Sequence, residues 1–248
     1  MFNSLEDNNH QRIGYQDGVL TNNLMIFQEL KDLYQPKSEQ KWRSGVKHDC
    51  ANVMEFYRVD GGFVNRLGEL IDLEETFLFP LFKGSDVAQG RTKSTNRYVL
   101  ITQKCIGEPT ENIKDLAPKT WNYINSHAKY LDARKSKIYQ NNPRFSIFGV
   151  GNYTFSPWKI AICGLYKKLN FRLIGRINNK PAVFDDTVYF LAFDDETTAY
   201  QAFMLLNSPL ATNFYYSLIF WDEKRPVKTN ILNSLNLSAL ENRLSMAL

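Results

Sequence analysis

The segment from Trp158 to Phe193, WKIAICGLYKKLNFRLIGRINNKPAVFDDTVYFLAF, is the most informative about the fold class. Its β-branched and aromatic runs predict strands at 158–164, 171–174 and 188–193, with a short strand near Val183. Glycine and asparagine between the runs predict turns. Because the strands come in a cluster and do not alternate strictly with helices, they favour an α+β domain with a mixed, mostly antiparallel, curled sheet.

Apolar periodicity predicts helices on both sides of this cluster, at 21–34, 117–131, 196–206 and 210–220. Thr21 is the expected N-cap of the first helix. Extended segments are expected at 41–60, 97–103 and 145–150, with a hairpin turn at Gly61-Gly62. Residues 1–18 are predicted to be a loose lead-in, and residues 19–248 to form one domain with helices flanking the sheet.

Composition excludes several classes of protein. Hydrophobic residues make up 44% and charged residues 23% of the chain, which predicts a packed core and excludes wholesale disorder. Apolar runs are too short to span a bilayer, and the first residues do not resemble a secretory signal, so we expect a cytoplasmic protein without membrane contact. The three cysteines and three histidines are scattered, which predicts neither a disulfide framework nor a metal site.

Charge is strongly polarised along the chain. Residues 83–180 carry 18 Lys/Arg and 5 Asp/Glu, a net charge of +13, between flanks of −5 (residues 1–82) and −4 (residues 181–248). Aromatic and amide residues are interleaved with these cations, as in Lys137-Ile138-Tyr139-Gln140-Asn141-Asn142. Lys and Arg neutralise phosphates, whereas Asn and Gln read adenine edges, so the block predicts DNA binding.

Common catalytic signatures are missing from the sequence, namely the phosphate loop, G-x-G-x-x-G, G-x-S-x-G and H-E-x-x-H. Two carboxylate clusters remain, Asp185-Asp186 and Asp222-Glu223-Lys224. Asp186, Asp222 and Lys224 therefore make up an alternative hypothesis, a Mg²⁺-dependent nuclease. A second alternative is a domain whose basic face binds an acidic protein.

Eleven segments, read in order, resemble the C-terminal target-recognition region of bacterial restriction–modification DNA methyltransferases of the adenine-N6 kind. The segments are IGYQDG (13–18), KWRSGVKHDC (41–50), FPLFKGSDV (79–87), TQ (102–103), APKTW (117–121), RKSKIY (134–139), FSIFGVG (145–151), PWKIA (157–161), DDT (185–187), LNSPL (206–210) and KRP (224–226). The resemblance extends from about Ile13 to Leu240. It implies a target-recognition-domain-like fold that reads double-stranded DNA.

In that family, the catalytic half precedes this region and carries a glycine-containing S-adenosylmethionine loop and an Asn/Asp-Pro-Pro-Tyr/Phe motif that holds the flipped adenine. The present chain has neither, since Asn142-Pro143-Arg144-Phe145 lacks the second proline. The resemblance therefore implies no S-adenosylmethionine site and no catalytic residue on this chain. It also implies a separate methyltransferase catalytic subunit as a partner.

The DNA-contacting residues that we expect are cations, amides, a hydroxyl and a tyrosine of the basic block. They are Lys83, Ser85, Arg97, Gln103, Arg134, Lys135, Lys137, Tyr139, Gln140, Asn142, Lys167, Lys168 and Arg172.

Overall fold

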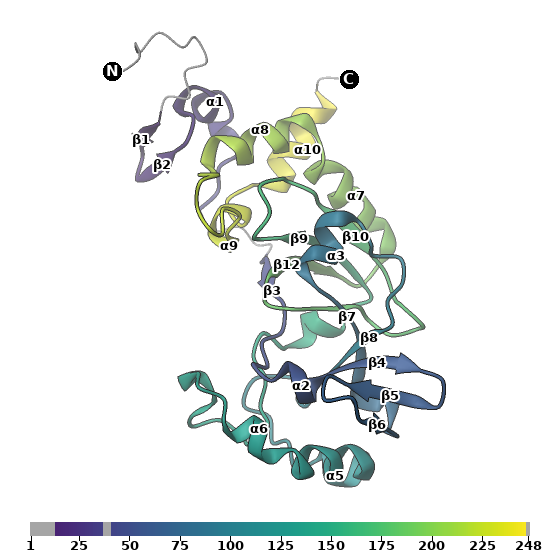
Figure 1. Cartoon of the computed structure of the whole chain (residues 1–248). Helices are drawn as coiled ribbons and strands as arrows, with labels where there is room; N and C mark the ends of the chain where they lie inside the picture. The colour runs from purple at the N-terminus through teal and green to yellow at the C-terminus, as the bar shows by residue number, and fades with distance from the viewer. Residues whose placement is uncertain (1–12, 37–40, 247–248) are drawn as a thin grey trace, which may run out of the picture. The chain divides into compact units, whose positions relative to one another are not determined.

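The computed structural model describes residues 13–36 and 41–246 (Figure 1). Contacts divide the chain into two compact units. The first unit comprises Met1–Lys41, Gly164–Leu169 and Gln201–Leu248, and the second comprises Trp42–Cys163 and Asn170–Tyr200. Among the described residues, none of the helices combines the length and the apolar character that a membrane span requires.

The larger sheet of the second unit has six strands in the order β11-β7-β8-β4-β5-β6. Along the chain these are β4 (Glu55–Val59), β5 (Gly62–Asn65), β6 (Leu70–Ile71), β7 (Leu78–Phe82), β8 (Arg97–Leu100) and β11 (Val183–Phe184). Neighbouring strands are antiparallel except β11 and β7, which are parallel. The predicted hairpin turn is confirmed, and Gly61 takes the left-handed φ of 88° that this tight connection needs.

The second sheet of this unit has four strands, in the order β10-β9-β12-β3. These are β3 (Arg43–Ser44), β9 (Trp158–Cys163), β10 (Arg172–Ile174) and β12 (Val188–Phe193), and every neighbouring pair is antiparallel. The strands predicted from Trp158 to Phe193 thus form the centre of this sheet. The α+β class with mostly antiparallel pairing is confirmed.

Short helices connect and cover these strands. They are α2 (Ala51–Met54), η2 (Glu75–Phe77), α3 (Gly84–Gln89), α4 (Ile113–Leu116), α5 (Pro118–Ser126), α6 (Ala128–Asp132), η3 (Lys137–Tyr139) and η4 (Asn152–Phe155). The helix predicted at 117–131 is interrupted at His127, so it becomes α5 and α6. Proline at the first position of α5 costs no hydrogen bond, because the first amides of a helix have no partner within it.

Aromatic packing joins α5 to the six-stranded sheet. The Phe56 ring lies 5.6 Å from that of Tyr123, and the Phe63 ring lies 5.3 Å from that of Tyr98. Tyr123 also donates a hydrogen bond of 2.9 Å to the Val53 carbonyl oxygen. A satisfied hydroxyl lets this tyrosine be buried without an unpaired polar group.

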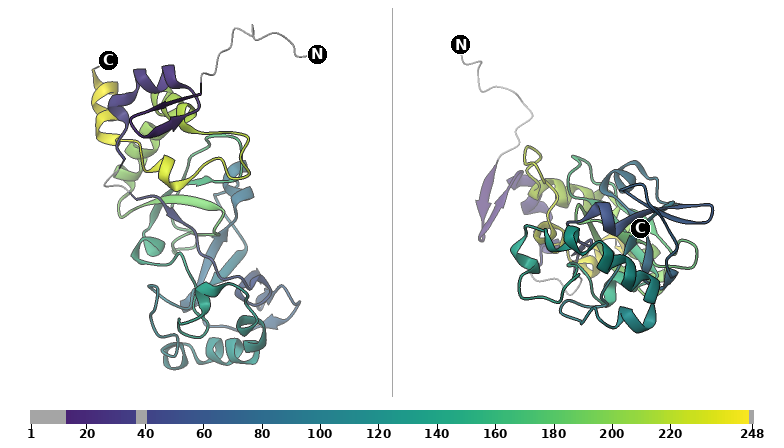
Figure 2. Two further views of the ribbon diagram at one scale, coloured as in Figure 1. Left: turned by 90° about the vertical axis from the view of Figure 1, so that its left-hand side faces the viewer. Right: turned by 60° about the horizontal axis from the view of Figure 1, so that its bottom comes forward.

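The first unit joins residues 13–36 to the C-terminal helices. Its elements are β1 (Gly14–Gln16), β2 (Val19–Thr21), α1 (Leu24–Glu29), η1 (Lys31–Leu33), α8 (Pro209–Leu218), α9 (Thr229–Leu232) and α10 (Leu237–Ser245), and α7 (Glu196–Leu206) ends in it. In Figure 2, α1 lies beside α8 and α10. The amide of Asn22 donates to the Ser217 carbonyl (2.7 Å), and that of Asn236 donates to the Leu33 carbonyl (2.9 Å).

Four predicted segments differ from the structure. No strand forms at 145–150, because Phe145 and Gly149 take positive φ angles of 67° and 72° that an extended strand cannot contain. Residues 51–54 of the predicted extended segment are the helix α2. The first helix begins at Leu24 with Asn23, not Thr21, as its N-cap. Most of the predicted lead-in (1–12) lies outside the described residues, and 14–16 already form β1.

Candidate nucleic-acid interface

A buried carboxylate, Glu55 at the start of β4, organises one group of charged side chains. Glu55 is 4% exposed, and its Oε1 accepts a hydrogen bond of 2.8 Å from Lys83 Nζ. Burial raises the pKa of Glu55, but hydrogen bonds from His48 and Lys83 and their attraction outweigh burial and bring it to about 2. The carboxylate is therefore ionised at neutral pH and holds Lys83 beside it.

The tautomer of His48 follows from its neighbours. The backbone amide of Cys50 donates to His48 Nδ1 at 3.2 Å, so this nitrogen acts as an acceptor. The ring proton of neutral His48 must then lie on Nε2, which is 3.4 Å from Glu55 Oε1. His48 thus serves as a hydrogen-bond donor to the buried carboxylate.

A second carboxylate, Asp86 on α3, binds two arginines. Its Oδ1 lies 3.0 Å from Arg91 Nη2, and its Oδ2 lies 2.7 Å from Arg97 Nη1. Burial raises the pKa of Asp86, but the hydrogen bonds from the Lys83 amide and from both guanidinium groups lower it further than burial raises it. The Arg97 guanidinium also lies 5.9 Å from the centre of the Tyr57 ring.

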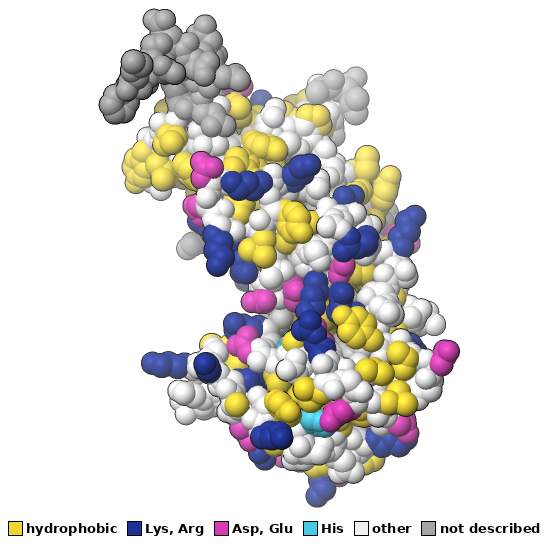
Figure 3. All heavy atoms as spheres, viewed as in Figure 1, with side chains coloured by type: hydrophobic (Ala, Val, Ile, Leu, Met, Phe, Trp, Pro, Cys, Tyr) yellow, Lys and Arg dark blue, Asp and Glu magenta, His cyan; other side chains and the backbone are white. Residues whose placement is uncertain are grey.

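Four residues predicted to contact DNA therefore gather around α3: Lys83, Ser85, Arg97 and Arg172. Ser85 is exposed on the first turn, and Arg172 Nε donates to the Val87 carbonyl at 3.4 Å. The structure adds two exposed arginines that the sequence analysis missed. We call Arg66, Lys83, Arg91, Arg97 and Arg172 the α3 basic cluster. Figure 3 shows Lys and Arg side chains gathered beside α3 and over β7 and β8.

The α3 basic cluster and the carboxylates that it contacts have a net positive charge. Four of its five cations pair with the two buried carboxylates, and Arg66 remains exposed although it lies 3.8 Å from Glu55. Cationic side chains that buried partners already hold in place lose little conformational freedom when a ligand binds. This arrangement suits repeated anionic groups such as the phosphates of a nucleic acid.

The loop from Arg134 to Asn142 contains six predicted DNA contacts, and three of them point inward. Arg134 donates to the carbonyl oxygens of Leu131 (2.7 Å) and Ser146 (2.6 Å), and burial lowers its pKa. The Tyr139 ring lies 3.7 Å from its guanidinium carbon, and Asn142 Nδ2 donates to the Ile138 carbonyl at 2.8 Å. These three side chains thus hold the loop in shape, and their predicted contact with DNA stays a prediction.

The other three residues of this loop are exposed. Lys135, Lys137 and Gln140 make no side-chain hydrogen bond or ion pair among the described residues. The half-buried Arg134–Tyr139 pair fixes the backbone from which they project. The loop thus presents two charges and one amide to solvent, the combination that phosphate and base contacts require.

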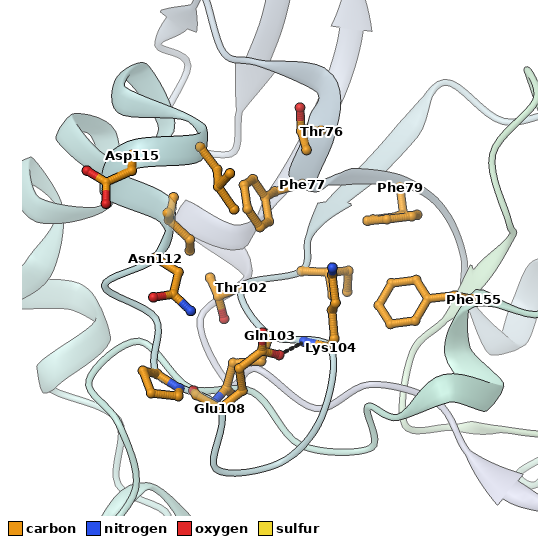
Figure 4. A pocket seen from close by; sticks show the side chains of 14 residues that line it. Thr76, Phe77, Phe79, Thr102, Gln103, Lys104, Glu108, Asn112, Asp115 and Phe155 are labelled. Carbon is orange, nitrogen blue, oxygen red and sulfur yellow. Dashed lines mark hydrogen bonds between the residues drawn. The ribbon is translucent and has the colours of Figure 1, made fainter.

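Gln103 cannot serve as a base contact in this conformation, which corrects a part of the prediction. It is buried, and its Oε1 accepts from the Ile147 amide at 3.0 Å while its Nε2 donates to the Glu108 carbonyl at 2.5 Å. It lies at a cavity of about 450 Å³ whose apolar wall includes Phe77, Phe79 and Phe155 (Figure 4).

Lys167 and Lys168 belong to the first unit. Both are exposed, and Lys167 Nζ lies 3.7 Å from Asp222 Oδ1. An exposed ion pair of this length contributes little free energy, so both lysines remain available to an anion.

The residues of the nuclease alternative lie in different units, Asp186 in the second and Asp222 and Lys224 in the first. Within the part of the chain that the structure describes, no three His, Cys, Asp or Glu residues are grouped as a metal site.

Comparison with known proteins gives one strong similarity. The chain is 63% identical over 240 residues to the type II methyltransferase M.NspV of Nostoc sp. (strain ATCC 29411 / PCC 7524), a match that covers 97% of this chain and 50% of that protein. No protein-family model matches the chain.

A solved structure of the type IIL restriction–modification enzyme MmeI in complex with DNA is more distantly similar. Its sequence identity is 11% and its TM-score is 0.46, over 81% of this chain and 25% of that one. The sequence match is the stronger finding: this chain is similar to one half of a type II methyltransferase, which agrees with the resemblance to a part of a restriction–modification methyltransferase.

Proposed function

We propose that this chain is the DNA target-recognition part of an adenine-N6 methyltransferase of a restriction–modification system. The observation that carries the proposal is the 63% identity to half of a type II methyltransferase along nearly the whole chain. A methyltransferase needs one part that transfers the methyl group and one that selects the site. The motif resemblance assigns the second role to this half.

The charged surface supports this role. The α3 basic cluster and the exposed Lys135, Lys137, Lys167 and Lys168 provide phosphate contacts, which fix the register of a protein on duplex DNA. Gln140 is the exposed amide that we assign to base reading, because its side chain can pair bidentately with adenine N6 and N7.

We assign cofactor binding and methyl transfer to the other half of the methyltransferase. The support for this assignment is the motif resemblance, which implies that the S-adenosylmethionine loop and the adenine-holding motif of the family lie outside the region that this chain matches.

Selection from randomised DNA duplexes tests the proposal. The purified chain is incubated with the library at low salt, bound DNA is recovered, and enrichment is followed over several rounds. We expect one enriched sequence motif and an affinity that falls steeply with salt. Binding without any enriched sequence, or no binding at low salt, would overturn the recognition role. Metal-dependent cleavage of the library would favour the nuclease alternative.

A further inference from the structure

The hairpin of β1 and β2 in the first unit has two unlike faces. Its register pairs Gly14 with Thr21 and Tyr15 with Leu20. Thr21 is buried, its hydroxyl donates to the Gly14 carbonyl at 3.1 Å, and a Cβ at Gly14 would lie 2.7 Å from Leu24 Cδ2. The Gly14–Thr21 face is thus packed closely against the start of α1.

The opposite face exposes large apolar side chains. Ile13, Tyr15 and Leu20 are 65%, 71% and 56% exposed. Because alternate residues of a strand share a face and Tyr15 lies directly opposite Leu20, these side chains form one continuous surface, which we call the hairpin apolar face. Figure 3 shows hydrophobic side chains gathered at the position of β1 and β2.

Such a face is costly to leave in water. A sheet of only two strands is marginally stable by itself, and no third strand pairs with this one among the described residues. Isolated exposed apolar residues are common on proteins, but contiguous patches mark interaction sites. The hairpin apolar face therefore has the character of a surface that another protein covers.

The polar surroundings indicate what kind of partner fits. Asp17 and Lys31 form an ion pair with each other, and Gln28 donates to Gln16 Oε1 at 3.0 Å. The charges of Asp17 and Lys31 are thus already compensated, and the three residues of the hairpin apolar face carry no charge. A nucleic acid gains little there, whereas an apolar protein surface buries all three side chains.

We propose that the hairpin apolar face is the contact surface for the other half of the methyltransferase, an inference that rests on the proposed function. The relative extends well beyond the matched region, which is 50% of its length. It therefore has a second half that needs a fixed position relative to the recognition half. A second copy of this chain is the competing occupant, which the experiment separates.

Hydroxyl-radical footprinting tests this contact in a whole protein. In a chimera, this chain replaces the matched half of M.NspV, and methyl transfer by the chimera shows that the halves are assembled. We expect oxidation of Tyr15 to be at least about fivefold slower in the chimera than in the chain alone, because a covered ring is shielded from solvent. Equal oxidation rates would overturn the inference.

Paired substitutions provide the second measurement. Tyr15→Ser with Leu20→Ser should lower the unfolding midpoint of the chimera and leave that of the chain alone unchanged. The matched control is Val59→Ser with Leu70→Ser, two exposed apolar residues of the second unit, which should change neither protein. An equal effect of both pairs on the chimera would overturn the assignment.

Self-association is measured by sedimentation velocity of the chain alone, which we expect to remain monomeric. A dimer that Tyr15→Ser with Leu20→Ser disrupts would assign the face to a second copy and overturn the inference. If the DNA selection enriches no sequence but Tyr15 is still protected from oxidation in the chimera, the proposed recognition role is wrong and the inferred contact between the two halves is still supported.

Discussion

Lys83 Nζ and Glu55 Oε1 are 2.8 Å apart, and this ion pair joins the first residue of β4 to the residue that precedes α3. Asp86, three residues further on, holds Arg91 and Arg97. Two buried carboxylates thus position the cations of the candidate interface before any ligand is present. The cations in turn keep both carboxylates ionised in a buried setting.

Glu55→Gln should make stability less sensitive to acid. The folded-state pKa of Glu55, about 2, is below its unfolded value of 4.5, so its contribution is complete above pH 4.5 and is lost as the pH falls towards 2. At pH 7 we expect the variant to be less stable, with about 3 kcal/mol as the upper limit. Urea unfolding between pH 7 and 3 measures the difference, which should shrink with acid. Asp72→Asn, at an exposed carboxylate, should show almost no difference at any pH.

Lys159→Met should abolish a rise of stability at alkaline pH. Lys159 is buried on β9, its Nζ donates to the carbonyls of Ser156 and Ala182 at 2.8 Å, and burial lowers its pKa to about 7 from 10.5. Between these values the unfolded chain binds more protons, so stability rises with pH. Unfolding at pH 7 and pH 10 measures this rise. Exposed Lys93→Met should keep it, and an equal rise in the Lys159 variant would contradict the assignment.

Local patterns predicted the elements whose partners are close in the sequence. The β-branched and aromatic runs at 158–164 and 188–193 predicted β9 and β12, and the Gly61-Gly62 pair predicted the β4–β5 hairpin. Residues 145–150 look equally strand-like, but the Gln103 side chain and Arg134 hold their backbone from distant positions. Such long-range hydrogen bonds leave no periodic signal, so this segment could not be recognised as a loop.

The sequence predicted the positive charge of the candidate site, but not the direction in which its side chains point. The +13 block identified the segments that carry Lys83, Arg97 and Lys135, but it did not show that Arg134 points inward. Arg66 was missed because it lies outside that block. A carboxylate at Glu55 amid the apolar Met54 and Phe56 was the available signal, since a buried acid requires cationic partners.

Lys135→Ala combined with Lys137→Ala should weaken DNA binding without changing the preferred sequence. Both side chains are exposed, and loss of two phosphate contacts should lower the salt slope of the logarithmic affinity by up to about 2. Fluorescence anisotropy over a salt series measures the slope. Lys41→Ala with Lys224→Ala removes the same charge outside the basic block and should leave the slope unchanged. Equal slopes for both pairs would exclude this loop from phosphate contact.

Gln140→Ala should distinguish the contribution of base contacts to DNA binding from the contribution of charge. Gln140 is exposed next to η3, whereas Asn142 is tied to the Ile138 carbonyl, so only the first amide is free to meet a base. No charge is lost, so nonspecific affinity should stay nearly constant. Preference for the selected sequence should fall by about tenfold, or about 1.4 kcal/mol, if one bidentate pair is removed.

Asn142→Ala and Gln201→Ala provide the comparison for Gln140→Ala. Asn142→Ala should weaken specific and nonspecific binding together, because it loosens the loop that carries Lys137, and exposed Gln201 on α7 should tolerate alanine without effect. Competition binding with the selected duplex and a scrambled one measures both affinities for each variant. An unchanged ratio of the two affinities in Gln140→Ala would move base reading away from this loop and towards the residues around α3.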